Sequence, residues 1–131
     1  MMFEKYMIVE SQARNVGPAD GPPTGFAVGV RLPYYRGLVL SLVEDVALTV
    51  DGEAVPRQDL RLTVGGHPYT LAEMETETEA RWEMGEVATL HFERPGGLAP
   101  GEHLLQLMLH LRIAYMPFPG IRNAEKMVQV A

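Results

Sequence analysis

The strongest constraint on the fold is a period of two in the apolar residues, and it is clearest between residues 103 and 113. From Leu105 onward every second residue is apolar, whereas the residues between them are mixed in character. Alternate side chains of an extended strand point to opposite faces, so this pattern predicts a strand with one buried face. The same alternation occurs in residues 26–32 and 44–50. We therefore expect a chain built from half-buried strands.

Turn-forming residues separate these apolar runs. The 131 residues include 13 glycines and 10 prolines, and pairs such as Asp51-Gly52 and Gly65-Gly66 are typical of tight turns between strands. A first strand is expected at residues 6–9, a short helical turn only at residues 71–74, and a short last strand at residues 127–130. Strands at regular spacing with little helical signal predict an all-β fold, an antiparallel β-sandwich of jelly-roll type. The length favours a single domain over residues 1–131.

The composition limits the classes of partner. There are 17 acidic and 11 basic residues, which gives a formal net charge of −6. This charge repels both a phosphate backbone and an anionic membrane, so we expect no nucleic-acid and no membrane partner. The chain has no cysteine and therefore no disulfide or thiolate metal site. Its first residues lack the pattern of a signal peptide, and we expect a cytoplasmic protein.

No motif points to catalysis or metal binding by this chain. The histidines are His67, His91, His103 and His110. None of them has the short spacing typical of metal ligands, so we expect structural or surface roles, with a site assembled through space as the alternative. The alternating glutamates of residues 73–79 would share one face of an extended chain, and we interpret them as a solvated acidic edge or a docking edge. Ser11 and Ser41 lack a nucleophile elbow, so no catalytic residue is expected.

Two short segments combine the residue types that anchor protein interfaces. In chain order they contain Tyr34, Tyr35, Arg36, Arg81 and Trp82. Tyrosine, tryptophan and arginine offer a large contact area together with directed hydrogen bonds. Either these residues form contacts with a partner, or the aromatic rings belong to the core and the arginines extend over them.

The second face of the long strand at residues 103–113 is neither clearly polar nor clearly apolar. Its members include Met108, His110 and Arg112. An apolar surface bordered by polar groups is typical of a protein contact. We therefore add these three residues to the candidate interface and expect this small domain to form an obligate complex.

Six ordered blocks of the sequence resemble one family. They are residues 3–11, 31–37, 50–53, 69–71, 81–83 and 95–103. The motifs Pro-Tyr-Tyr-Arg-Gly and Arg-Trp-Glu are the most specific, whereas Pro-Gly-Glu-His is common in sandwich domains. Together they resemble the small β subunit of bacterial C-glycoside deglycosidases, from residue 3 to about residue 119.

The resemblance implies a two-subunit enzyme. The larger α subunit would have a xylose-isomerase-like barrel, hold a divalent metal such as Mn²⁺ and supply the acid and base groups. The substrate would be a 3-oxo-C-glycoside of a flavonoid or another aromatic aglycone. A ketone at C3 acidifies the C2 proton, so the carbon–carbon bond at C1 can break by β-elimination. The resemblance thus implies a lyase whose β subunit has no cofactor and no activity alone.

The resemblance gives the candidate residues positioning roles. Tyr34, Tyr35 and Arg36 are expected to contact the α subunit and the rim of the aglycone pocket, and Arg81 and Trp82 to form a second anchor. Two other hypotheses stay open at this point. One is a stand-alone carbohydrate-binding module, because sandwich domains with exposed aromatic residues often bind sugars. The other is a structural domain that only oligomerises.

Overall fold

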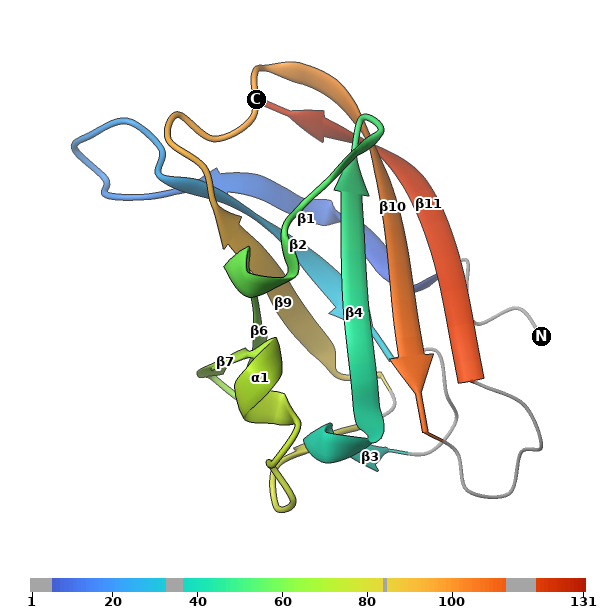
Figure 1. Cartoon of the computed structure of the whole chain (residues 1–131). Helices are drawn as coiled ribbons and strands as arrows, with labels where there is room; N and C mark the ends of the chain where they lie inside the picture. The colour runs from blue at the N-terminus through green and yellow to red at the C-terminus, as the bar shows by residue number, and fades with distance from the viewer. Residues whose placement is uncertain (1–5, 33–36, 84, 113–119) are drawn as a thin grey trace.

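The computed structural model describes residues 6–32, 37–83, 85–112 and 120–131, and its strands form two facing antiparallel sheets (Figure 1). The first sheet contains, in spatial order, β1 (Ile8–Val16), β2 (Gly25–Arg31), β9 (Val87–Glu93), β6 (Leu60–Val64) and β7 (His67–Thr70). The second contains β11 (Gly120–Val130), β10 (Gly101–Leu111), β4 (Val43–Val50) and β5 (Glu53–Ala54). The predicted all-β antiparallel sandwich is therefore confirmed.

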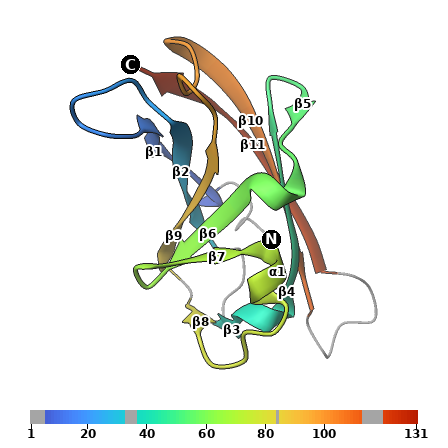
Figure 2. The same cartoon turned by 60° about the vertical axis from the view of Figure 1, so that its left-hand side comes forward.

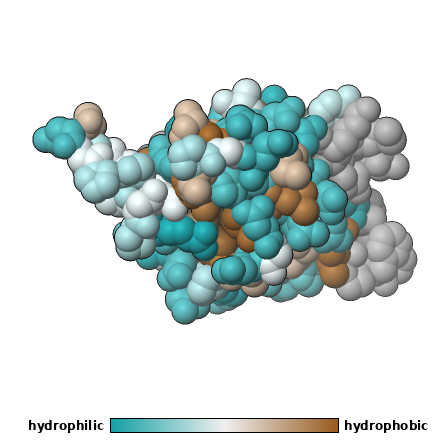
Figure 3. Space-filling view, turned by 90° about the horizontal axis from the view of Figure 1, so that it is seen from above, coloured by the Kyte–Doolittle hydropathy of each residue, from teal (hydrophilic) through white to brown (hydrophobic). Residues whose placement is uncertain are grey.

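Shorter elements complete the described chain. They are β3 (Leu38–Val39), paired with β8 (Arg81–Trp82), the 3-10 turns η2 (Leu40–Leu42) and η3 (Arg57–Asp59), and the helix α1 (Leu71–Met74). In Figure 2 the strands β1, β2 and β9 lie on one side of the molecule and β4, β10 and β11 on the other. Viewed from the end that carries the C-terminus, the surface is largely hydrophilic, with hydrophobic residues visible between polar ones (Figure 3).

The core lies between the two sheets and follows the predicted alternation. On β10 the buried side chains are Leu105, Leu107, Leu109 and Leu111. On β4 they are Val46, Leu48 and Val50. The opposing sheet contributes Phe26, Val28, Val30, Leu60, Leu62, Leu90 and Phe92. Burial of these side chains is the main favourable contribution to folding, and it fixes which face of each strand points outward.

The two predicted tight turns are confirmed. Asp51 and Gly52 join β4 to β5 with φ values of 51° and 86°, and Gly65 and Gly66 join β6 to β7 with 60° and 83°. Positive φ at both central residues is the geometry of a turn that matches the right-handed twist of a two-stranded hairpin. Glycine adopts this geometry without a steric penalty, which explains its place in both turns.

The predicted extended conformation of the acidic edge at residues 73–79 is wrong, although Glu73, Glu75 and Glu79 are exposed to solvent as expected. Thr70 and Glu73 form a capping box, because the Glu73 amide donates to Thr70 Oγ1 over 3.0 Å and the Thr70 amide donates to Glu73 Oε1 over 2.7 Å. The helical turn α1 follows directly, so the glutamates do not share the face of a strand. Glu77 instead accepts hydrogen bonds from the amides of Glu79 and Ala80. These bonds lower the pKa of the Glu77 carboxyl.

Three strand predictions also need correction. The last strand extends over Gly120–Val130 instead of residues 127–130, and all eleven of its residues pair with β10. The first strand reaches Val16, with a break in register between Val9 and Arg14. Strand β2 is buried on both faces, because it lies between β1 and β9 and its outward residues are as small as Ala27.

Candidate partner-contact surface

The outward side of the four-stranded sheet is the first candidate surface, here named the β10 face. Its members are Glu102, Leu104, Gln106, Met108 and His110 on β10, Asp45, Ala47 and Thr49 on β4, and Ile121, Asn123, Glu125, Met127 and Gln129 on β11. Directly opposed residues of neighbouring strands point to the same side of a sheet. Met108 therefore lies between Ala47 and Asn123 in one row.

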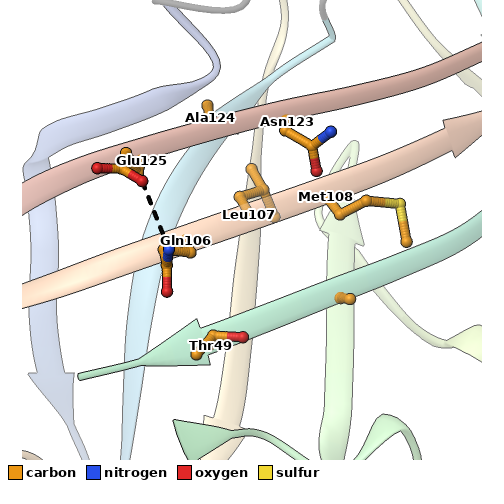
Figure 4. A pocket seen from close by; sticks show the side chains of 8 residues that line it. Thr49, Gln106, Leu107, Met108, Asn123, Ala124 and Glu125 are labelled. Atoms are coloured by element: carbon orange, nitrogen blue, oxygen red, sulfur yellow. Dashed lines mark hydrogen bonds between the residues drawn. The ribbon is translucent and has the colours of Figure 1, made fainter. Parts of the chain in front are cut away.

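A shallow hollow of about 460 Å³ lies in the middle of the β10 face (Figure 4). Its lining residues are Ala47, Thr49, Gln106, Leu107, Met108, Asn123, Ala124 and Glu125. The side chain of Met108 extends toward β4, and the Gln106 amide donates to Glu125 Oε1 over 3.4 Å. The centre of the hollow thus contains the unbranched apolar side chain of Met108, and polar side chains form its border.

The β10 face also carries exposed apolar side chains. In the part of the chain that the structure describes, the large hydrophobic residues that are exposed are Tyr6 (53%), Ile121 (46%) and Met127 (50%). Ile121 and Met127 lie on β11 at opposite ends of the β10 face, and the half-buried Met108 lies between them. Apolar groups surrounded by polar ones are characteristic of a surface that a protein partner covers.

His110 and Arg112 mark the end of the β10 face away from the turn at Asp51. His110 is opposed by Asp45 and Ile121, and the Arg112 guanidinium lies 2.9 Å from Glu44 Oε1. This hydrogen bond lowers the pKa of Glu44 and raises that of Arg112. The pair is exposed to solvent and contributes little to stability. The structure thus places Met108 in the middle of the β10 face and His110 at one end of it, with Arg112 directly after the end of β10.

Arg81 and Trp82 are neighbours in sequence but occupy different environments. The Trp82 side chain has 0% exposure, and its Nε1 donates to the carbonyl of Glu86 over 2.9 Å. A buried indole does not reach a partner, so the structure corrects the proposed anchor at Trp82 and supports the core interpretation. Arg81 is exposed, and it donates to the carbonyl of Gly37 over 2.9 Å and lies 3.5 Å from Glu83. Arg81 stays a candidate contact residue.

The candidates Tyr34, Tyr35 and Arg36 lie outside the described residues. The structure does place the next residue of the chain, Gly37, in contact with Arg81. Their expected contact with a partner therefore stays a prediction.

Comparison with known proteins gives the family. The sequence matches the family described as C-glycoside deglycosidase beta subunit over residues 3–115. This chain belongs to the C-glycoside deglycosidase beta subunit family. It is 37% identical to a C-glycoside deglycosidase beta subunit of Eubacterium cellulosolvens, over 88% of this chain and 78% of the relative. It is 36% identical to one of Arthrobacter globiformis, over 82% of this chain and 83% of the relative.

A third relative has a more specific name. The 3'-dehydrocarminate deglycosidase beta subunit of a Microbacterium species is 39% identical to this chain, over 91% of this chain and 85% of the relative. The family match ends at residue 115, before β11 begins at Gly120. Most of the β10 face, on β4 and β10, lies within the residues that match the C-glycoside deglycosidase beta subunit family.

The histidines of this family member have separate structural surroundings. His103 Nδ1 lies 2.6 Å from Asp51 Oδ2, and its Nε2 lies 2.6 Å from the carbonyl oxygen of Ala99. Both contacts raise the pKa of His103, and the hydrogen bond to Ala99 has the larger effect. Burial instead lowers the pKa of His91. Across the described ranges, no three histidine, aspartate or glutamate side chains are grouped so that they could bind a metal ion. None of the helices in these ranges has the length and hydropathy needed to cross a membrane.

Several residues of the β10 face were missed by the sequence analysis, namely Ile121, Asn123, Glu125 and Met127 on β11. The alternation that would have predicted this strand is weak, because the inward positions of this edge strand include the charged residues Arg122 and Lys126. The alternation of apolar and polar residues is therefore lost over much of β11. The buried apolar side chains of β11, Val128 and Val130, lie at its end and correspond to the short strand that was predicted.

Proposed function

We propose that this chain is the non-catalytic β subunit of a C-glycoside deglycosidase, and that its β10 face binds a larger α subunit. In this proposal the α subunit has a xylose-isomerase-like barrel and holds the divalent metal, such as Mn²⁺, and the acid and base groups. The observation that carries the proposal is the family match over residues 3–115. The β10 face supports it, because its exposed Ile121 and Met127 need a cover that the described chain does not supply.

The substrate class follows from the chemistry of the bond. A carbon-linked aglycone is a poor leaving group, so the sugar must be activated before the bond can break. The name of the Microbacterium relative includes a 3'-dehydro compound, which is consistent with a sugar oxidised at C3. A ketone at C3 makes the C2 proton acidic, a base of the α subunit removes it, and the aglycone carbon is protonated as it leaves C1. This carbon–carbon lyase reaction is a β-elimination.

The role of this chain in that reaction is positioning. Tyr34, Tyr35 and Arg36, together with Arg81, are proposed to contact the α subunit near the rim of the aglycone pocket. Met108, His110 and Arg112 are proposed to contact it through the β10 face. The alternative of a stand-alone carbohydrate-binding module loses part of its support, because Trp82, one of the aromatic residues that favoured it, is buried.

Co-expression with the α subunit of a C-glycoside deglycosidase tests this function. We expect the two chains to co-purify, and we expect Mn²⁺-dependent cleavage of a 3-oxo-C-glucoside by the complex but not by this chain alone. Cleavage by the isolated chain, or failure of the wild-type chain to bind the α subunit, would contradict the proposal.

A matched pair of variants tests the surface. Met108→Glu places a charge in the hollow of the β10 face without touching the core, and we expect it to prevent co-purification with the α subunit. Ala72→Glu changes the net charge equally at an exposed position on α1 and should leave assembly unchanged. Equal assembly of both variants would remove the β10 face from the proposal and leave the family function intact.

A further inference from the structure

The segment of residues 94–100, here named the crossover, joins β9 of the first sheet to β10 of the second and is held at two points. At the first point the Asn15 side chain donates to the Leu98 carbonyl over 2.9 Å and accepts from the Leu98 amide over 2.8 Å. At the second point the His103 ring contacts the carbonyl of Ala99. The crossover therefore has one anchor that is an amide side chain and one that is a titratable ring.

The His103 ring has an acceptor on each side. Its Nδ1 lies 2.6 Å from Asp51 Oδ2, and its Nε2 lies 2.6 Å from the carbonyl oxygen of Ala99. An ionised carboxylate and a carbonyl oxygen have no hydrogen to donate, so both contacts are hydrogen bonds only when both ring nitrogens carry a proton. The arrangement at His103 is therefore that of the charged imidazolium.

Two charged residues of the described chain act on this ring. Asp51, in the turn between β4 and β5, favours the imidazolium, whereas Arg94, at the start of the crossover, opposes it. The Asp51 carboxylate is fixed in place because its Oδ1 also accepts from the Leu104 amide over 2.8 Å. On β11 the residue directly opposed to His103 is the uncharged Val128. The balance raises the pKa of His103, first through the hydrogen bond to the Ala99 carbonyl and then through that to Asp51.

Loss of one proton leaves the ring with a single donor for two acceptors. The carboxylate of Asp51 is the stronger acceptor because it is charged, so the remaining proton stays on Nδ1. The lone pair of Nε2 then faces the carbonyl oxygen of Ala99, and this carbonyl loses its donor, which is unfavourable. Because Asn15 still holds Leu98, the change is confined to the residues that follow Leu98.

We propose that His103 is a pH-sensitive clamp on the crossover: its imidazolium ties Ala99 to the turn at Asp51, and its neutral ring releases Ala99. At low pH the crossover is fixed at both anchors, and at high pH it is fixed only at the amide anchor. Two of the blocks that carry the family resemblance, residues 50–53 and 95–103, meet at this ring. The proposal goes beyond the proposed function and does not depend on it, because it concerns contacts within this chain.

NMR spectroscopy of the purified full chain between pH 5 and pH 9 tests the clamp. We expect both ring nitrogens of His103 to be protonated at low pH and only Nδ1 at high pH. Across the same transition, the order parameter of the Ala99 Cα–Cβ bond, measured by methyl relaxation, should fall from about 0.85 to below about 0.6. Ala88, which is buried in β9, is the rigid reference and should stay unchanged. Constant order at Ala99 while His103 titrates, or a neutral ring protonated on Nε2, would overturn the proposal.

Two variants identify the group that titrates. His103→Gln has a side chain that is neutral at every pH, so the order of Ala99 should no longer depend on pH. The matched control His67→Gln makes the same replacement at an exposed position on β7 and should retain the transition. Asp51→Asn removes the charge beside the ring and should move the transition to lower pH. A pH-dependent change at Ala99 that persists in His103→Gln would assign it to another group and overturn the proposal.

Discussion

Replacement of Trp82 separates its role in the core from a role at an interface. The Trp82 side chain has 0% exposure, and its indole donates to the carbonyl of Glu86 over 2.9 Å. Its strand, β8, pairs with β3 through Leu38. Removal of the ring therefore leaves both a cavity and a carbonyl without its donor.

The expected magnitude follows from these two losses. Truncation of a buried tryptophan to alanine costs about 3–5 kcal/mol of unfolding free energy. Trp82→Phe retains most of the apolar volume and loses the hydrogen bond, so we expect about 1–3 kcal/mol. A domain of ordinary stability has about 5–15 kcal/mol in total, so Trp82→Ala removes a large part of it.

Urea unfolding followed by far-UV circular dichroism measures these losses. Trp82 is the only tryptophan, so tryptophan fluorescence reports unfolding of the wild type but is absent from both variants. With an m value of about 1–3 kcal/mol/M, Trp82→Ala should lower the urea midpoint by roughly 1–5 M. Arg81→Ala, at the exposed neighbouring position, should change the unfolding free energy by less than about 0.5 kcal/mol. If Trp82→Ala leaves the midpoint unchanged and only weakens assembly with the α subunit, the core interpretation is refuted.

Two further predictions concern single hydrogen-bonded groups. Thr70→Ala removes one half of the capping box of α1 and should lower the unfolding free energy by about 1 kcal/mol. Thr78→Ala, at an exposed position, is the control. Equal urea midpoints for the two variants would argue against a stabilising cap. When protonated, His103 donates to two acceptors, and its pKa is raised on folding. Its contribution to stability is therefore complete below about pH 6.5 and is lost as the pH rises through its folded pKa. An NMR titration of His103 should show this raised pKa, and His103→Gln should remove the corresponding fall in melting temperature; a titration at or below the ordinary histidine value would contradict the interpretation.

Local patterns in the sequence determined the strands that carry a clear alternation. The apolar residues at every second position of β10 and β4 predicted their buried faces, and Asp51-Gly52 and Gly65-Gly66 predicted two hairpin turns. Both kinds of signal depend on residues close together in the chain. The short helical turn expected at residues 71–74 is local as well, and the structure adds a capping box within three residues that the sequence analysis had not used.

Only the tertiary structure decided which side chains share a surface. The pairing of β1, β2, β9 and β6 places Arg14, His91 and Arg61 in one row, and no local pattern encodes that row because the three residues are far apart in the sequence. The burial of Trp82 likewise depends on the packing of the corner formed by β3 and β8. Strand β11 was underestimated because an edge strand tolerates charged residues at inward positions. The period of a strand is a local property of the backbone, whereas register and packing arise from contacts between distant segments, and this difference explains which predictions were confirmed.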